Sequence, residues 1–201
     1  MNRGAYYDDM RSLAWGVRKE YGLTTARVLR SDLRRIYRHE GIVIVPWPYK
    51  LRKLNGAYFH DDLGATVMLK ASLPPEPMVF TMGHELKHHL ADRDSGHSFC
   101  DVSNESNYIE IGAEIFAAEL IFPEDDFATA ARDIGIRRGH CAPELLVRLK
   151  HETRTTMHYA SMVKRVVFLG LAIASELPTG GWRKLEERLY GRPYRRLPRR
   201  S

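Results

Sequence analysis

The sequence predicts an α+β fold with a small antiparallel sheet, a long helix that carries a histidine motif, and a helical C-terminal part. Two observations favour this class. Apolar residues recur at helical spacing on both sides of residues 42–69, and that stretch itself contains short β-branched runs. A length of 201 residues with a 44% hydrophobic share suits one ordinary folded domain, or a catalytic core with a small helical appendage.

Helical segments are predicted before and after the strands. Residues 5–21 and 31–40 show helical spacing, and Ser31 is placed to cap the second of these helices. Residues 78–93 and 107–122 predict two longer helices, the second of which a following proline ends.

Three short strands are predicted between these helices. Residues 42–45 form a β-branched run that Pro46 stops, and residues 56–59 and 65–69 are joined by the polar turn 61–64. We therefore expect a small antiparallel sheet directly before the motif helix.

The chain divides by pattern into a core over residues 1–135, a helical subdomain over 136–190 and a basic flexible tail over 191–201. Residues 124–191 contain four short helical segments separated by glycine and proline breaks. The formal net charge is +6, and five of these charges are the tail arginines Arg192, Arg195, Arg196, Arg199 and Arg200. Such a tail is usually solvated, and nucleic acid or an acidic partner is its alternative role.

The composition predicts a cytoplasmic protein with no membrane partner. Residues 1–9 are polar and acidic, unlike an export signal, and no apolar run approaches the roughly 18–20 residues of a membrane helix. Cys100 and Cys141 are too few for a disulfide framework, so reduced thiols are the simplest interpretation.

Residues 84–88 read His-Glu-Leu-Lys-His on a predicted helix. Residues four apart lie on one helix face, so His84 and His88 can reach the same metal ion. Neutral imidazole suits zinc, and a catalytic zinc keeps three protein ligands. Glu85 projects beside the metal and can accept a proton from the attacking water. The alternative is a solvated helix face that carries these residues by chance.

The third ligand has several candidates. Glu110 lies early in the next apolar helix, and Glu114 one turn later could accept a hydrogen bond from a ligand histidine. Both could instead be exposed acids favoured by the helix dipole. Asp94 lies six residues after His88, the position of the last ligand in a longer motif. That motif needs a glycine for a tight turn at residue 91, where this chain has Ala91. The pair His97 and Cys100 is a weaker possibility.

Three further polar aromatic residues are candidates for a place near the site. His89 points about 100 degrees away from its neighbour along the helix, which favours a surface or supporting position over ligation. His158 and Tyr159 could hydrogen-bond a tetrahedral intermediate, but packed or surface positions are favoured for both.

Two segments resemble the ImmA/IrrE metallopeptidases. Residues 80–90 read FTMGHELKHHL and residues 110–123 read EIGAEIFAAELIFP, close to the family patterns FTLAHELGH and ExxANxFAAELLMP. The strand patterns before the motif agree as well, so the resemblance covers about residues 5–170.

The resemblance implies a zincin-like core and a zinc-dependent peptidase. It implies that His84, His88 and Glu110 hold the metal and that Glu85 is the general base. In zincin-like folds an extended substrate joins an edge strand above the metal, and we expect residues 65–69 to be that strand.

The family cuts helix-turn-helix repressors that silence mobile elements or stress-response genes, so a repressor is the expected substrate. Lys87 replaces the usual glycine, and Glu114 stands where asparagine or aspartate is usual, which leaves the surroundings of the ligands open. The rival interpretation is a non-catalytic regulator or toxin-like partner that binds a repressor or DNA.

Overall fold

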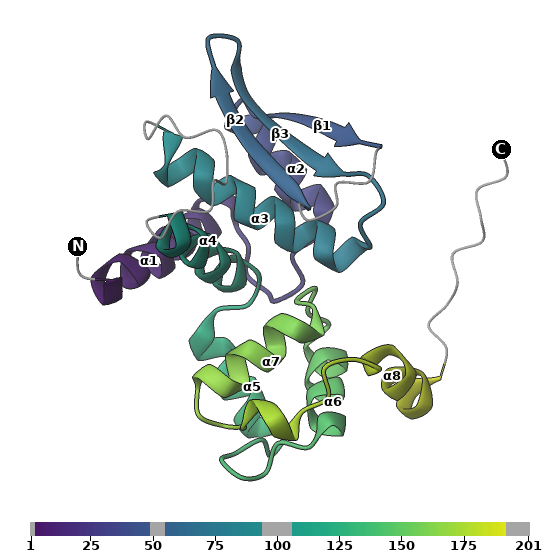
Figure 1. Cartoon of the computed structure of the whole chain (residues 1–201). Helices are drawn as coiled ribbons and strands as arrows, with labels where there is room; N and C mark the ends of the chain where they lie inside the picture. Colours follow the sequence, from purple (N-terminus) through teal and green to yellow (C-terminus); the bar gives the residue numbers. More distant parts are fainter. Residues whose placement is uncertain (1–2, 49–54, 94–105, 192–201) are drawn as a thin grey trace, which may run out of the picture. The chain divides into compact units, whose positions relative to one another are not determined.

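A computed structural model describes residues 3–48, 55–93 and 106–191 of the chain. The chain forms two compact units. One comprises Met1–Glu124 with Thr155–His158, and the other Asp125–Arg154 with Tyr159–Ser201. The domain ranges drawn from the sequence stay predictions. The predicted α+β class is confirmed (Figure 1).

Two helices open the first unit. Helix α1 spans Arg3–Tyr21, and α2 spans Arg30–His39. The prediction that Ser31 caps α2 is wrong, because the helix begins one residue earlier. The cap position is Leu29, whose N–H donates to the Asp32 side chain at 2.8 Å. The first-turn carboxylate thus satisfies the N–H of the cap residue itself, while no side chain at the cap position accepts from the first turn of the helix.

The sheet is mixed and three-stranded. It contains β1 (Val43–Trp47), β2 (Gly56–Asp61) and β3 (Gly64–Lys70) in the order β1-β3-β2. The predicted antiparallel pairing describes β2 and β3, whereas β1 pairs with β3 in parallel. The chain reverses direction between Asp61 and Gly64, so β3 runs opposite to β2, and the same strand also pairs with β1, which runs in the same direction as β3.

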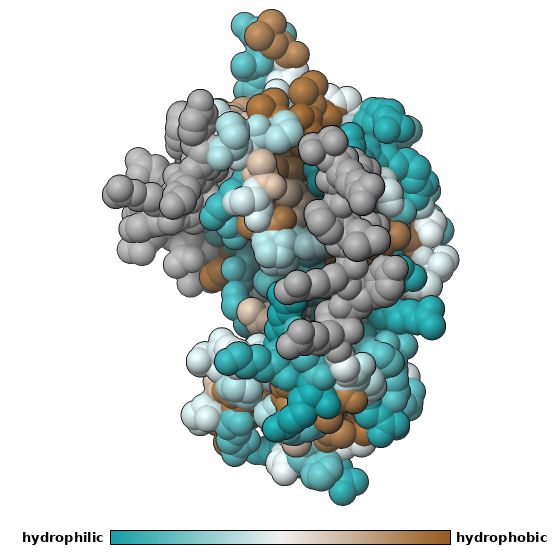
Figure 2. Space-filling model, turned by 90° about the vertical axis from the view of Figure 1, so that its right-hand side faces the viewer, coloured by the Kyte–Doolittle hydropathy of each residue, from teal (hydrophilic) through white to brown (hydrophobic). Residues whose placement is uncertain are grey.

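The central position of β3 corrects the expected edge strand. Val67 is fully buried, and both edges of β3 pair with other strands, so a substrate has no free edge at residues 65–69. Strand β1 continues through Pro46, which an edge strand tolerates because one side of it makes no ladder bonds. Val43 and Val45 on this strand are exposed. Figure 2 shows hydrophobic surface gathered in the upper part of that view.

Helices α3 (Pro75–Ala91) and α2 lie against the sheet, and α4 (Ser106–Ile121) packs on α3 (Figure 1). The approach of α3 to α4 is close at Gly83, where an added Cβ would meet the Ala117 Cβ at 3.3 Å. Helix α1 in turn packs on α4. The motif helix is therefore enclosed between the sheet on one side and α4 on the other.

The second unit is helical, as predicted. Its segments are α5 (Glu124–Asp133), α6 (Pro143–Thr153), α7 (Tyr159–Phe168) and α8 (Trp182–Tyr190), with the short 3₁₀ turn η2 (Ala174–Glu176) before α8. Across the described ranges, no helix combines the length and apolar character needed to cross a bilayer.

Candidate metal centre

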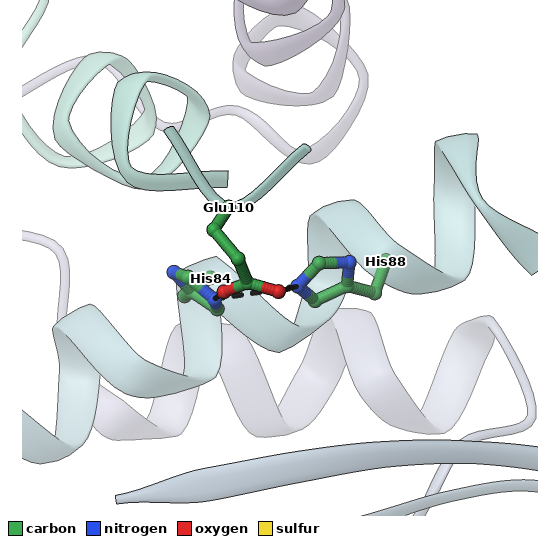
Figure 3. Close-up of side chains that lie close together, drawn as sticks. All are labelled: His84, His88 and Glu110. Carbon is green, nitrogen blue, oxygen red and sulfur yellow. Dashed lines mark hydrogen bonds and ion pairs between the residues drawn. The ribbon is translucent and has the colours of Figure 1, made fainter. Parts of the chain in front are cut away.

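Three side chains from α3 and α4 converge at one point. The Nε2 atoms of His84 and His88 are 3.3 Å apart. The Glu110 carboxylate lies against both rings, with Oε2 at 3.0 Å from His84 Nε2 and Oε1 at 3.6 Å from His88 Nε2. Figure 3 shows the carboxylate of Glu110 reaching between the two rings. The structure thus brings together the three side chains that the family resemblance implies as metal ligands.

The spacing of these atoms fits a zinc ion. Zinc bonds imidazole nitrogen and carboxylate oxygen at about 2.0–2.2 Å, so ligand atoms at tetrahedral angles lie about 3.3 Å from one another. The two Nε2 atoms lie 3.3 Å apart and Glu110 Oε2 lies 3.0 Å from His84 Nε2, close to that value, while the other carboxylate oxygen lies 3.6 Å from His88 Nε2. The donor set of two histidines and one glutamate is that of several catalytic zinc sites, which leave a fourth position for water.

His88 is oriented by an acid that the sequence analysis overlooked. Its Nδ1 is 2.6 Å from Asp92 Oδ2, so the ring donates Nδ1–H to the carboxylate and keeps the Nε2 lone pair for a metal. Burial by itself raises the pKa of Asp92, but hydrogen bonds from His88 and Lys87 outweigh it and lower that pKa. The position of Asp92 four residues after His88, at the C-terminal cap of α3, was the available signal.

Glu85 lies on α3 beside the ligands and faces the start of β2. A Cβ added at Gly56 would lie 2.7 Å from Glu85 Oε1 and 2.6 Å from Thr81 Cγ2, so only glycine lets the strand approach this closely. Glu85 is buried, and burial raises the pKa of its carboxyl against the opposing effect of His84 and His88. A carboxyl group with a raised pKa is suited to accept and return a proton near neutral pH.

Lys87 is the second residue whose role the sequence did not indicate. Its side chain is 0% exposed, and Nζ donates to Asp92 Oδ2 at 2.6 Å and to the Ile109 carbonyl at 3.2 Å. The ring centroid of Tyr6 lies 5.5 Å from Nζ. Burial lowers the pKa of Lys87, which the hydrogen bond to Asp92 partly opposes.

His84 has one carboxylate as a partner and others nearby. Burial lowers its pKa, but the hydrogen bond to Glu110 and the charges of Glu85, Glu110 and Glu114 produce a net increase. Glu114 itself is exposed one turn after Glu110. Its expected role as a supporting acceptor for a ligand histidine stays a prediction.

The remaining candidate residues make other contacts or lie outside the described residues. His89 is buried, and its Nδ1 lies 3.1 Å from the Tyr58 hydroxyl. The ring of His158 packs on Phe80 at 4.9 Å between centroids. The alternative ligands Asp94, His97 and Cys100 lie outside the described residues, as does the tail beyond residue 191.

A second group of possible ligands, Glu20, His39 and Glu40, lies on α1 and at the end of α2. Glu20 and His39 are exposed, and the Tyr21 hydroxyl lies 2.6 Å from His39 Nδ1 and donates to Glu40. Exposed acids often gather without an ion, so this group does not indicate a metal site.

A buried glutamate beside two histidines, with one further glutamate against both rings, is the arrangement found in metallopeptidase centres. The model of peptidase family M78, described as the IrrE N-terminal-like domain, matches residues 38–154. This match covers more than half of the chain, so the chain belongs to that family, and the resemblance to ImmA/IrrE proteins is confirmed. Members are peptidases that typically depend on a metal. No curated protein sequence matches the chain.

Proposed function

We propose that this chain is a zinc-dependent endopeptidase in which His84, His88 and Glu110 hold the metal and Glu85 is the general base. The convergence of three ligand atoms within 4.8 Å of one another carries this proposal. A helix-turn-helix repressor is the proposed substrate class, which would make cleavage a step in derepression of mobile-element or stress-response genes.

The metal and the side chains around it have different roles in the proposed reaction. Zinc supplies Lewis acidity, which polarises a carbonyl group and acidifies water. Glu85 accepts the proton of the attacking water and delivers it to the leaving amine. Asp92 keeps the His88 ring in the orientation that ligation needs, because it accepts the Nδ1 hydrogen at 2.6 Å.

The proposed substrate path runs along β2 in place of β3. Among the described strands, β2 pairs only with β3. Its first residue, Gly56, lies against Glu85, so an extended peptide that paired with the other edge of β2 would pass close to the general base. An extended substrate must come from a linker or a locally unfolded segment, so compact proteins should be cleaved slowly.

The test separates metal binding from proton transfer. The wild-type protein, purified without added zinc and then titrated with zinc, should bind about one equivalent and cleave members of an unstructured peptide library. Glu85→Gln should bind zinc equally well and lose about 10²–10⁴-fold in cleavage rate, because general-base catalysis contributes that much. Mass spectrometry measures the products, and Glu76→Gln on the first turn of the same helix is the matched control.

Two results would contradict the proposal. A folded wild-type protein that takes up no zinc and cleaves nothing would favour the rival, a non-catalytic regulator. Equal cleavage by wild-type and Glu85→Gln protein would remove Glu85 from the reaction.

A further inference from the structure

We propose that Lys87 is a positioning residue of the metal centre, whose buried ammonium group fixes both the partner of His88 and the backbone that carries Glu110. This inference rests on the proposed function, because it assigns a role within the same centre. Three contacts from three different parts of the chain carry it.

The first contact joins Lys87 to the orientation of His88. Lys87 Nζ and His88 Nδ1 each lie 2.6 Å from the same atom, Asp92 Oδ2. One carboxylate oxygen therefore accepts both hydrogen bonds, and the ammonium group fixes where that oxygen lies. The His88 ring points its Nδ1–H at this oxygen, so its Nε2 is directed toward Glu110, 3.6 Å away.

The second contact joins Lys87 to the third ligand. Nζ donates to the carbonyl of Ile109 at 3.2 Å, which is the residue directly before Glu110 on α4. Helix α3 carries both histidines, so this hydrogen bond fixes the helix that supplies one ligand against the helix that supplies two. The 3.0 Å separation between Glu110 Oε2 and His84 Nε2 depends on that register.

The third contact covers the ammonium group. The Tyr6 ring lies over Nζ, and Gly112 on α4 leaves the space that this ring occupies. A Cβ at Gly112 would lie 2.6–2.9 Å from three atoms of the Tyr6 ring and hydroxyl. Glycine at this position therefore permits α1 to exclude water from the lysine, which strengthens the hydrogen bonds of the ammonium group.

A purely structural lysine is the alternative, and the chain contains one for comparison. Lys150 in the second unit is also buried, and its Nζ lies 5.1 Å from the centroid of the Tyr159 ring. The two lysines thus share burial and an aromatic neighbour. Lys87 differs because its carboxylate partner is also the partner of a ligand histidine.

The experiment compares Lys87→Met with Lys150→Met in the full chain. Zinc affinity is measured by competition with a chelator, and the tautomer of His88 is measured by nitrogen-15 NMR in zinc-free protein. We expect Lys87→Met to weaken zinc binding about 10–100-fold, the usual cost of disturbing the partners of metal ligands. We also expect His88 to lose its single Nδ1–H tautomer. Lys150→Met should keep both properties, although both variants lower the melting temperature.

Each outcome decides the matter. Unchanged zinc affinity and an unchanged His88 tautomer in Lys87→Met would overturn the proposal and leave Lys87 a packing residue. Equal losses of affinity in both variants would also overturn it. If wild-type protein binds no zinc, the proposed function fails, and the tautomer comparison alone decides the role of Lys87. If Lys87→Met does not fold, Lys87→Leu, which also lacks a donor, is judged by the same two measurements.

Discussion

The two units of this chain bury charged side chains in different surroundings. In the first unit, Glu85 and Lys87 are buried beside the three proposed metal ligands, and Asp92 bonds both Lys87 and His88, one of those proposed ligands. In the second unit, Lys150 and Arg165 are buried over the faces of aromatic rings. The comparison teaches that a buried charge is a poor sign of a reaction centre by itself. Several metal-ligating side chains whose donor atoms lie close enough to share one ion are a better sign of a reaction centre.

The largest expected difference between the units is in metal binding. His88→Ala removes one of three proposed ligands and should abolish stoichiometric zinc binding, because the two remaining side chains hold zinc poorly. His151→Ala in the second unit removes a ring that stacks on Tyr190 at 3.8 Å and should keep about one zinc. Metal analysis after dialysis measures both variants. Loss of zinc from the His151 variant would show that the comparison assigns the site to the wrong unit.

A smaller difference is expected from glycine substitutions. Gly56→Ala forces a Cβ to within 2.7 Å of Glu85 Oε1, and such overpacking typically costs about 1–3 kcal/mol in the free energy of unfolding. Gly180→Ala in the second unit meets nothing within 4 Å and should change stability by less than about 1 kcal/mol. Urea unfolding measures both. Similar costs at the two positions would contradict the close approach of β2 to Glu85.

The pH dependence of stability should reflect Asp92. Hydrogen bonds from His88 and Lys87 outweigh burial and place the pKa of Asp92 below its ordinary value of 3.8. The ionised group therefore stabilises the fold above that pH, and this contribution disappears as the pH falls through the lower folded-state value. Wild-type protein should lose stability more steeply below about pH 4 than Asp92→Asn does. If the two proteins lose unfolding free energy equally steeply below about pH 4 in urea unfolding, Asp92 lacks these partners in solution.

The smallest effect is expected from the basic tail. Removal of residues 191–201 should leave zinc binding and peptide hydrolysis unchanged, because the proposed ligands and general base all lie on α3 and α4. Only salt-sensitive association with nucleic acid or another charged partner should weaken. Cleavage assays compare peptide hydrolysis by the two chains, and binding to a DNA duplex at low and high salt measures the association. A truncated chain that no longer hydrolyses short peptides would make the tail part of the catalytic unit.

The sequence by itself determined the local features of this protein. The spacing of His84 and His88 places them on one face of any α-helix, so their proximity needs no tertiary information. The hairpin of β2 and β3 and the helix ends near prolines and glycines were predictable for the same reason, since turn and helix signals act over a few residues.

Tertiary structure decided which distant groups meet. The sequence left Glu110 among several possible third ligands, and the packing of α4 on α3 places it against His84 at 3.0 Å. The insertion of β3 between β1 and β2 likewise follows from packing, because hydrophobic alternation sets which face of a strand is buried and leaves its neighbours open. The cover of Tyr6 over Lys87 joins residues 81 positions apart, and no periodic pattern encodes a contact of that range.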